Sequence, residues 1–254
     1  GKTGHRGGTP ELLERLEELK PRLEREIKLR KPERIVFIEA GDLFENFESG
    51  GNPMFTNDLS LAQQMDMAGT ILFDFISICA LFAPVTILAV TSNHTSWRKG
   101  KLELGRPQDD LGIFVHRQVA KQTQAAGIDA TWVVPGDYED SVIFDVYNTR
   151  LGVTHGHKAG SQKNVTNWWM KQQHGGQPIG SADVLIHGHW HHFTYEPTGR
   201  NPYTGISRRL IGLPTLDNGS DWYRATSGDD SDPGMLIFEV DPEHGFDLRS
   251  LDII

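Results

Sequence analysis

RIVFIEAGD, from Arg34 to Asp42, is a short apolar run that ends in a glycine and an aspartate. Such a run is typical of a buried strand that passes directly into a loop. A second stretch, VTILAVTSNH from Val85 to His94, has the same form and also ends in polar residues. A long helix is predicted between the two, somewhere within residues 57–82, and an amphipathic helix follows the second and stops near Gly127. The first half of the chain is therefore predicted to be βαβα.

The N-terminal segment is predicted to be an amphipathic helix. Thr9 has the form of an N-cap, and the proline that follows it favours the first helical position. Apolar residues then recur on one helical face from Leu12 to Ile27, and Pro21 is expected to kink or split this helix. After Gly127 short apolar runs alternate with short connections, which predicts a second half that is mostly β. The predicted fold class is α/β, and residues 1–254 are expected to form a single domain.

The composition excludes some kinds of protein. The 254 residues carry a net charge of −9, with 25 basic and 34 acidic side chains, which argues against a protein that coats nucleic acid through a broad basic surface. It does not exclude an enzyme that acts on nucleic acid, because bound divalent cations supply positive charge locally. Cys79 is the one cysteine, so neither an intramolecular disulfide nor a cysteine-based zinc site is expected.

One segment, Ile71 to Val90, is apolar enough to imitate a membrane span. Asp74 lies within it and Pro84 interrupts it, so we interpret it as a helix that ends near Phe82 and a buried strand that begins at Val85. The given sequence also begins without the pattern of a secretory leader. We therefore expect a cytoplasmic protein that does not enter the membrane.

Residues that bind metals follow four of the predicted strands. They are Asp42, Asn93 with His94, His155, and the pair His189 and His191. Because the carboxyl ends of strands in open α/β sheets line a single crevice, these scattered positions are expected to converge. Nitrogen and oxygen donors without a thiolate suit Mn²⁺, Fe or Zn²⁺, and the chemistry typical of a pair of such ions is hydrolysis at phosphorus.

The stretch IHGHWHH, Ile186 to His192, bears on the number of cations. If the chain leaves the sheet in extended form, the side chains of His189 and His191 point the same way, roughly 7 Å apart. That spacing suits one histidine on each of two cations that lie roughly 3.5–4 Å apart. We therefore expect two divalent cations, with Mn²⁺ favoured over Fe and Zn²⁺. His187 and His192 are interpreted as residues that orient the ligands.

The other candidate residues have distinct expected roles. The two carboxylate oxygens of Asp42 allow it to bridge both cations, Asn93 brings a neutral oxygen, and His155 brings a further nitrogen. His94 is adjacent to Asn93 and need not share its target. It is therefore the candidate catalytic residue, a proton donor to the leaving oxygen.

In this order, GDLFEN, TSNHTS, THGH and HGHWHH resemble four signature motifs of the calcineurin-like metallophosphoesterase superfamily: GD-x-x-(E/D), GNH, a histidine-glycine and GH-x-H. The resemblance covers Arg34 to His192. It implies a two-sheet β-sandwich flanked by helices, in α/β/β/α order, with a dinuclear metal site. The implied roles are a bridging Asp42, one metal site completed by Asn93, His155 and His189, a second site served by His191, and protonation of the leaving group by His94.

Three positions depart from the family pattern. The family's first motif, D-x-H, supplies two ligands to the second metal, and it does not occur before Asp42. We expect it just upstream of Gly1, and the alternative is a degenerate second metal site. Ser92 stands where the family usually has glycine, and Thr95 stands where it often has an acid that polarises the catalytic histidine. The strength of His94 as an acid is therefore left open.

A basic run follows the catalytic segment. Arg98, Lys99 and Lys101 are expected to bind a phosphodiester backbone or a nucleotide phosphate, and the alternative is a solvated basic loop.

The predicted function is metal-dependent hydrolysis of phosphoesters, with phosphodiester bonds in nucleic acid such as DNA as the leading substrate. The alternatives are a phosphatase or phosphodiesterase that acts on a small nucleotide, and a non-catalytic metal-binding or scaffold domain. The SNH motif with its basic loop is also similar to phosphoesterases encoded by phages. The sequence does not indicate an oligomeric state.

Overall fold

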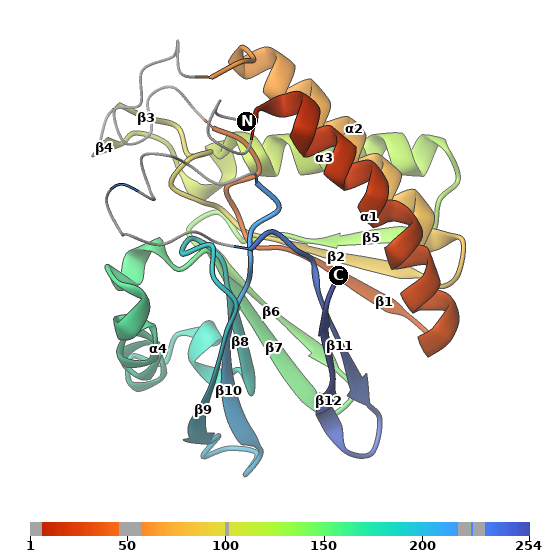
Figure 1. Ribbon diagram of the computed structural model, residues 1–254. Coiled ribbons are helices and arrows are strands. Elements are labelled where there is room, and N and C mark those ends of the chain that lie inside the picture. Colours follow the sequence, from red (N-terminus) through yellow and green to blue (C-terminus); the bar gives the residue numbers. More distant parts are fainter. Residues whose placement is uncertain (1–6, 46–56, 100–101, 218–224, 226–231) are drawn as a thin grey trace.

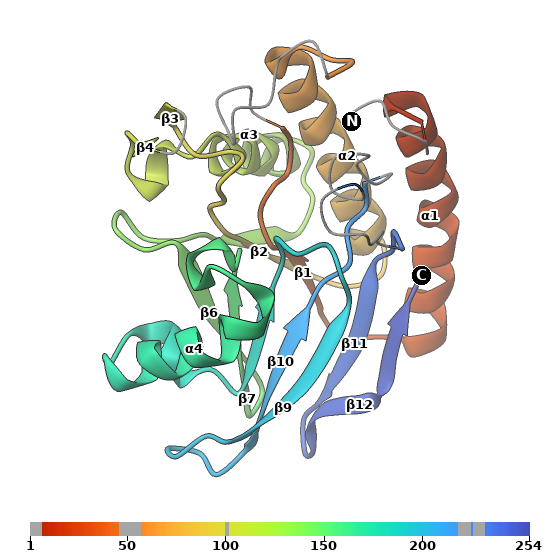
Figure 2. The same ribbon diagram turned by 60° about the vertical axis from the view of Figure 1, so that its left-hand side comes forward.

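Two β-sheets pack face to face in this protein, and helices cover the outer face of each (Figure 1, Figure 2). The structure is a computed structural model that describes residues 7–45, 57–99, 102–217, 225 and 232–254. One apolar core lies between the sheets, and two others each lie between a sheet and its helices. This is the α/β/β/α sandwich that the motifs implied, so the predicted fold class is confirmed.

The first sheet and its helices come from the first half of the chain. The elements are α1 (Thr9–Arg30), β1 (Ile35–Glu39), α2 (Leu61–Ala80), β2 (Val85–Ala89), α3 (Leu111–Ala125) and β5 (Ala130–Val133). The sheet is parallel, with the order β1-β2-β5, and all three helices lie on its outer face. The predicted βαβα order is therefore confirmed. The membrane-like segment is divided between α2 and β2 as predicted, and every helix of the described residues is too short or too polar to cross a bilayer.

α1 runs without a break through its proline; of the two effects predicted for Pro21, a split of the helix is wrong, and a kink stays a prediction. Pro21 lies on the exposed side of the helix, whereas Leu19 and Leu23 are buried against the core. The backbone carbonyl that loses its partner to the proline ring can bind water on that side. Packing of the leucine face therefore outweighs the local cost of the proline.

The second sheet has five strands. They are β6 (Ser141–Val146), β7 (Thr149–Thr154), β8 (Val184–His187), β9 (Thr194–Arg200) and β10 (Ser207–Gly212). Their order is β6-β7-β8-β10-β9, and β7, β8 and β10 run parallel to one another. A helix, α4 (Val165–His174), covers the outer face of this sheet. No helix was predicted here, so the prediction of a second half made mostly of strands is right except for α4.

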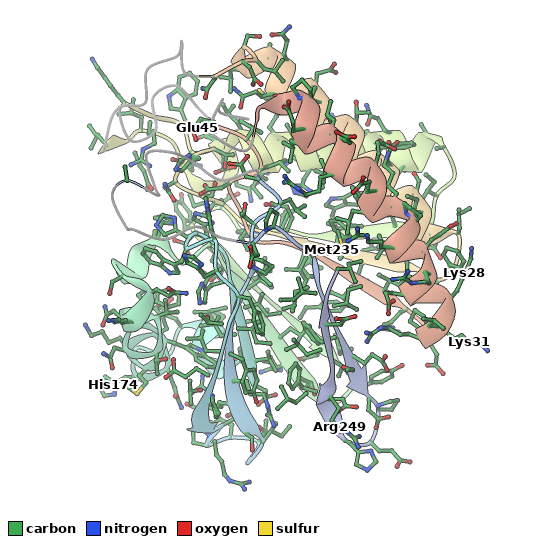
Figure 3. The ribbon with its side chains drawn as sticks, in the orientation of Figure 1. Lys28, Lys31, Glu45, His174, Met235 and Arg249 are labelled. Atoms are coloured by element: carbon green, nitrogen blue, oxygen red, sulfur yellow. The ribbon has the colours of Figure 1, made fainter. Side chains whose placement is uncertain are left out.

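Two short ladders and four 3-10 helices complete the described elements. β3 (Arg98–Lys99) pairs with β4 (Leu102–Glu103), and β11 (Leu236–Asp241) pairs with β12 (Gly245–Ile253). The 3-10 helices are η2 (Pro107–Asp109), η3 (His157–Ala159), η4 (Gln162–Asn164) and η5 (Pro178–Ser181). Met235, directly before β11, packs against the core beneath α1 (Figure 3).

The middle strand of the first sheet is buried on both faces. Ile87 lies in the core beneath the helices and the next residue, Leu88, lies in the core between the sheets; each is 0% exposed. Parallel strands covered on both sides have continuous apolar runs rather than an alternation of apolar and polar residues. This is why the stretch from Val85 to Val90 resembles part of a membrane span in the sequence alone.

Strands of both sheets end at one edge of the sandwich. Thr154 and His187 are paired as the last residues of β7 and β8, so the chain leaves these two strands side by side. In the first sheet, Glu39 and Ala89 are paired as the last residues of β1 and β2. The loops that follow these four strands carry the predicted metal ligands.

Leu88→Ala is expected to lower the free energy of unfolding by about 3 kcal/mol, because it removes a fully buried side chain and leaves a cavity between the sheets. Leu81→Ala is the matched control, since Leu81 is 75% exposed, and it should change the free energy by less than about 0.5 kcal/mol. Urea unfolding of both variants measures the difference. Equal losses would contradict the packing described above.

Candidate metal centre

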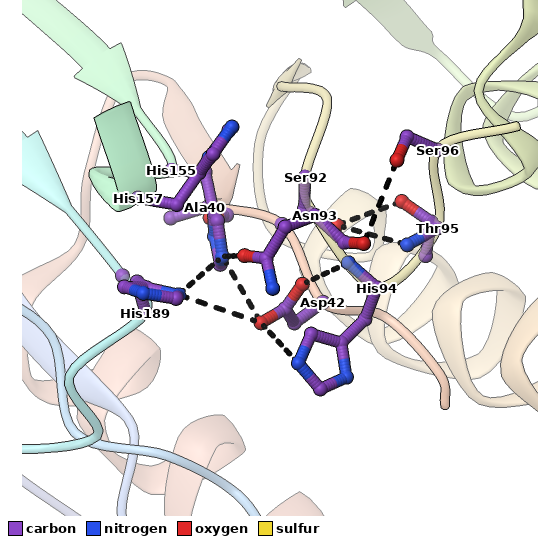
Figure 4. A network of polar contacts seen from close by, with 12 residues as sticks. Ala40, Asp42, Ser92, Asn93, His94, Thr95, Ser96, His155, His157 and His189 are labelled. Carbon is purple, nitrogen blue, oxygen red and sulfur yellow. Dashed lines mark hydrogen bonds and ion pairs between the residues drawn. The ribbon is translucent and has the colours of Figure 1, made fainter. Parts of the chain in front are cut away.

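The turn after β1 holds Asp42 in an unusual backbone conformation. Gly41 has a φ of 92° and Asp42 a φ of 58°, both in the left-handed region. A Cβ atom at residue 41 would lie 2.6 Å from His155 Nδ1 and 2.7 Å from Ser92 Cβ, so only glycine fits there. Left-handed backbone at a residue other than glycine is a form of strain that is concentrated at functional sites. Here it accompanies a carboxylate oxygen that lies 3.0 Å from the ring of His155 (Figure 4).

His155 reaches the same point from the second sheet. Its Nδ1–H donates a hydrogen bond to the backbone carbonyl of Ala40 at 2.7 Å. Nε2 then faces Asn93 Oδ1 at 2.9 Å and Asp42 Oδ2 at 3.0 Å (Figure 4). Histidines that bind metals are held in the same way, with one nitrogen on a carbonyl and the other on the metal. The ring is therefore oriented before any cation binds.

The backbone of IHGHWHH is extended only to His187, where β8 ends. His189 and His191 have φ values of 72° and 62°, so the expectation that an extended segment places both rings on one side is wrong. With this turn, His189 Nδ1 lies 3.1 Å from His155 Nε2 and 4.0 Å from Asp42 Oδ2. The ring of His189 thus lies beside Asp42 and His155 as predicted, but a turn, and not an extended backbone, places it there.

The donor atoms have the spacing of ligands around one cation. Asp42, His155 and His189 each offer an atom within 4.8 Å of the others, and Asn93 Oδ1 lies 2.9 Å from the His155 donor. Around a cation with bonds of about 2.1 Å, donors stand about 3.0 Å apart at right angles and about 4.2 Å apart on opposite sides. The measured separations of 2.9, 3.0, 3.1 and 4.0 Å lie within that range. The residues present therefore fit a divalent cation in spacing and in donor chemistry.

His191 is the predicted ligand that this group of donors does not include. Burial lowers the pKa of the His191 ring, while the charge of Asp42 acts in the opposite direction. The ring is therefore within electrostatic reach of Asp42. A second cation held by His191 stays a prediction.

Asp42, which is half-buried, forms an ion pair with the buried His155. Burial acts to raise the pKa of Asp42, but the charges of His155 and His94 outweigh it and hold this pKa well below its usual range. Burial acts to lower the pKa of His155, and the charge of Asp42 outweighs it, so that pKa is raised. A cation that binds these two side chains must displace the proton on His155 Nε2, so metal affinity is expected to decrease as the pH falls.

His94 has a carboxylate partner that was not predicted. Its Nδ1 lies 2.8 Å from Glu45 Oε2, and its Nε2 lies 4.0 Å from Asp42 Oδ2. Thr95, at the position where the family often has an acid, is instead hydrogen-bonded to the buried Asp110. The acid that supports His94 therefore comes from another loop. Glu45 could have been identified from the sequence, because it is the acid of the GDLFE pattern, three residues after Asp42.

His157 is a second residue that was not predicted. Its ring centroid is 5.4 Å from that of His155 and 6.1 Å from that of His189. Both ring nitrogens are buried, and within the described residues neither has a hydrogen-bond partner. Burial, assisted by the charge of His155, lowers the pKa of His157 to about 4, so the ring is neutral at pH 7. The second histidine of THGH was the signal in the sequence.

Arg98 and Lys99 of the basic run form β3, which pairs with β4 beside the metal centre. Arg98 donates a hydrogen bond to the backbone carbonyl of Asn93 at 2.6 Å, which ties the hairpin to the loop that carries a metal ligand. Lys99 is exposed, and Lys101 lies outside the described residues. The contacts with phosphate that were expected of these three side chains stay a prediction.

Comparisons with known proteins give only distant similarities. No protein-family model matches this sequence, and no curated protein matches it. Among solved structures, the chain is similar to Vps29 of Entamoeba histolytica in complex with Zn²⁺, with 15% identity, a TM-score of 0.36, and coverage of 82% of this chain and 86% of that one. It is also similar to a predicted phosphoesterase of Streptococcus pneumoniae, with 11% identity, a TM-score of 0.33, and coverage of 87% and 95%. Likenesses at these scores do not bear on activity, so the chemistry of this chain has to be judged from its own side chains.

His157→Gln is expected to make the metal-free protein less sensitive to acid. The pKa of His157 is lowered from 6.5 to about 4 in the folded state, so between these pH values the unfolded chain binds a proton that the folded chain does not. Wild-type stability therefore falls as the pH decreases through this window, by about 3 kcal/mol from this residue in total and by about 2 kcal/mol between pH 7 and 5, and the variant should lose that part of the fall.

Urea unfolding in EDTA at pH 7, 6 and 5 measures this pH dependence. His174→Gln, at an exposed position at the end of α4, is the control and should keep the wild-type dependence. If His157→Gln also keeps it, the burial assigned to this ring is contradicted.

Proposed function

We propose that this chain hydrolyses phosphoesters with divalent cations bound at Asp42, Asn93, His155 and His189. The observation that carries the proposal is the spacing of these donors, which come from four loops: His155 lies 2.9 to 3.1 Å from each of the other three, and His189 lies 4.0 Å from Asp42. Divalent cations bound there would supply Lewis acidity toward the phosphoryl oxygens and toward an attacking water. Mn²⁺ is the favoured metal, and Fe and Zn²⁺ are the alternatives that the same donors accept.

His94 is proposed as the residue that protonates the leaving oxygen. Glu45 accepts a hydrogen bond from Nδ1–H at 2.8 Å and so stabilises the positively charged ring. Nε2, which lies 4.0 Å from Asp42 Oδ2, is then the nitrogen that delivers the proton. The backbone N–H of His94 also donates to Asp42 Oδ1 at 3.1 Å, so the proton donor and the metal carboxylate keep a fixed relation.

The proposal extends to a second cation, which Asp42 and His191 would hold. The resemblance to the calcineurin-like metallophosphoesterases implies further ligands for that site from a D-x-H motif. The pair formed by Glu45 and His94 favours catalysis over the non-catalytic alternative, a metal-binding scaffold with a degenerate second site, because it holds a candidate proton donor beside the metal donors.

Phosphodiester bonds in nucleic acid are the proposed substrate class. Arg98, Lys99 and Lys101 stand four to seven residues after His94, in a chain whose net charge is −9, so positive charge is concentrated next to the metal centre. Single- and double-stranded DNA, bis-p-nitrophenyl phosphate and p-nitrophenyl phosphate form the test panel. Turnover of the diesters supports the proposal, and turnover of the monoester alone favours the alternative, a phosphatase of small nucleotides.

Asp42→Asn is expected to lose both metal binding and hydrolysis. The substitution removes the negative charge that offsets the cation and leaves one oxygen where two are needed to bridge. Isothermal titration with Mn²⁺ and a diester assay measure the two losses. Full hydrolysis by the variant would contradict the assigned role of Asp42.

His94→Ala is expected to keep its bound metal and to slow turnover about 10²–10⁴-fold, the usual effect of removing a positioned acid. Glu45→Gln should slow the same step to a smaller extent, because the ring remains but loses its charged partner. Metal content by elemental analysis and kcat for a diester separate the two effects. Loss of metal from His94→Ala would show that its role was misassigned.

A further inference from the structure

We infer that Glu39, His116 and Trp132 form a positioning network that holds the turn of Asp42 in the conformation needed to bind metal. The inference rests on the proposed metal-binding role of Asp42. None of the three residues is among the metal donors, and none belongs to the motifs that were singled out in the sequence. They lie on the helix side of the first sheet, behind the loop that carries Asp42.

Glu39, the last residue of β1, receives hydrogen bonds from two different elements. Its Oε1 accepts the backbone N–H of Gly41 at 2.7 Å, and its Oε2 lies 3.2 Å from His116 Nε2 in α3. The His116 side chain is 0% exposed and that of Glu39 is 13% exposed. The Glu39 carboxylate therefore connects the backbone N–H of Gly41, the residue before Asp42, to the buried side chain of His116 in α3.

Trp132 decides which nitrogen of His116 carries the proton. Its indole Nε1–H, which can only donate, points to His116 Nδ1 at 3.3 Å. His116 Nδ1 must therefore accept, and in the neutral ring Nε2 carries the hydrogen that is donated to Glu39. The chain of donors runs in one direction, from Trp132 through His116 to Glu39, and each acceptor is satisfied.

α3 holds the second metal loop as well. Asp110, at the N-cap of α3 and 1% exposed, accepts the backbone N–H of Ser92 at 3.2 Å and the hydroxyl of Thr95 at 2.8 Å. These residues flank Asn93 and His94. Asp110 at the N-cap of α3 and His116 within this helix thus hold both loops of the first sheet that supply the metal centre.

A carboxylate is required at residue 39 because both of its neighbours are donors. In Glu39→Gln, the single amide oxygen can accept from Gly41 or from His116, but not from both. The amide NH₂ then faces the N–H group of the other residue, so two donors meet. Trp132 prevents His116 from relieving this conflict by moving its proton to Nδ1. The turn that places Asp42 in its left-handed conformation, with a φ of 58°, then loses its support.

The test is a double-variant cycle read out as Mn²⁺ affinity. Glu39→Gln should weaken Mn²⁺ binding about 10–100-fold, the usual effect of removing a group that orients a metal ligand. Trp132→Phe frees His116 Nδ1 to take the proton. In that background, the factor by which Glu39→Gln weakens Mn²⁺ binding should be at least about threefold smaller than in the wild-type background. Isothermal titration gives the dissociation constants, and the melting temperature of each variant is recorded in parallel.

Asp183→Asn is the matched control. Asp183 is also a buried carboxylate, 1% exposed, and it accepts the backbone N–H of Arg150 at 2.9 Å and the amide of Asn201 at 2.7 Å. It precedes β8, at the end of that strand away from the metal centre. Its replacement should lower the melting temperature yet leave the Mn²⁺ dissociation constant within about twofold of wild type.

Three results would overturn the inference: wild-type affinity in Glu39→Gln, an equal effect of Glu39→Gln in both backgrounds, or an equal loss of affinity in Asp183→Asn. Its failure is separable from that of the proposed function. If the affinities behave as expected and no phosphoester is hydrolysed, the proposed function fails and the positioning network stands. If the wild type hydrolyses diesters and Glu39→Gln binds Mn²⁺ as tightly, only the network is wrong.

Discussion

The hydrogen bond from His155 Nδ1–H to the carbonyl of Ala40 joins the two sheets at the edge where the candidate metal centre lies. Ala40 follows β1 in the first sheet and His155 follows β7 in the second, so this 2.7 Å contact sets the distance between loops that belong to different sheets. It also fixes the tautomer of His155 and turns Nε2 toward Asp42. Without this hydrogen bond, the donor atoms from the two sheets would have no fixed spacing and would not form a single cation site.

That approach of the two sheets has a steric requirement. A Cβ atom at residue 41 would lie 2.6 Å from the ring of His155, and one at residue 188 would lie 2.9 Å from the carbonyl oxygen of Ala40. The glycines of GDLFEN and HGHWHH are therefore needed for close contact between loops. The residues that follow them, Asp42 and His189, have left-handed φ values of 58° and 72°. Such conformations persist only where the surrounding structure holds them, which here means two packed sheets and the buried contacts of Glu39.

The elements that could be predicted are those with long apolar patterns, such as β1, α2 and β2. α4 could not be predicted, because only Val165 and Trp169 of its ten residues are buried, and two positions do not establish a helical period. Pro21 is the opposite case, since a local signal against a helix is outweighed by the packing of α1. Glu45 and His157 stood within recognised motifs, but nothing local shows that Glu45 meets His94, or that the ring nitrogens of His157 are buried without a hydrogen-bond partner among the described residues.

By itself, the sequence determined the chemistry of the donors and their positions at the ends of strands: carboxylate, amide and imidazole groups without a thiolate, in loops that follow apolar runs. Only the tertiary structure decided which donors meet, how His189 turns toward them, and that Glu45 rather than residue 95 supports His94. The physical reason is that the direction of a side chain in a loop depends on a few backbone angles and on contacts with distant segments. Ala40 and His155, whose hydrogen bond sets these directions, are 115 residues apart in the chain.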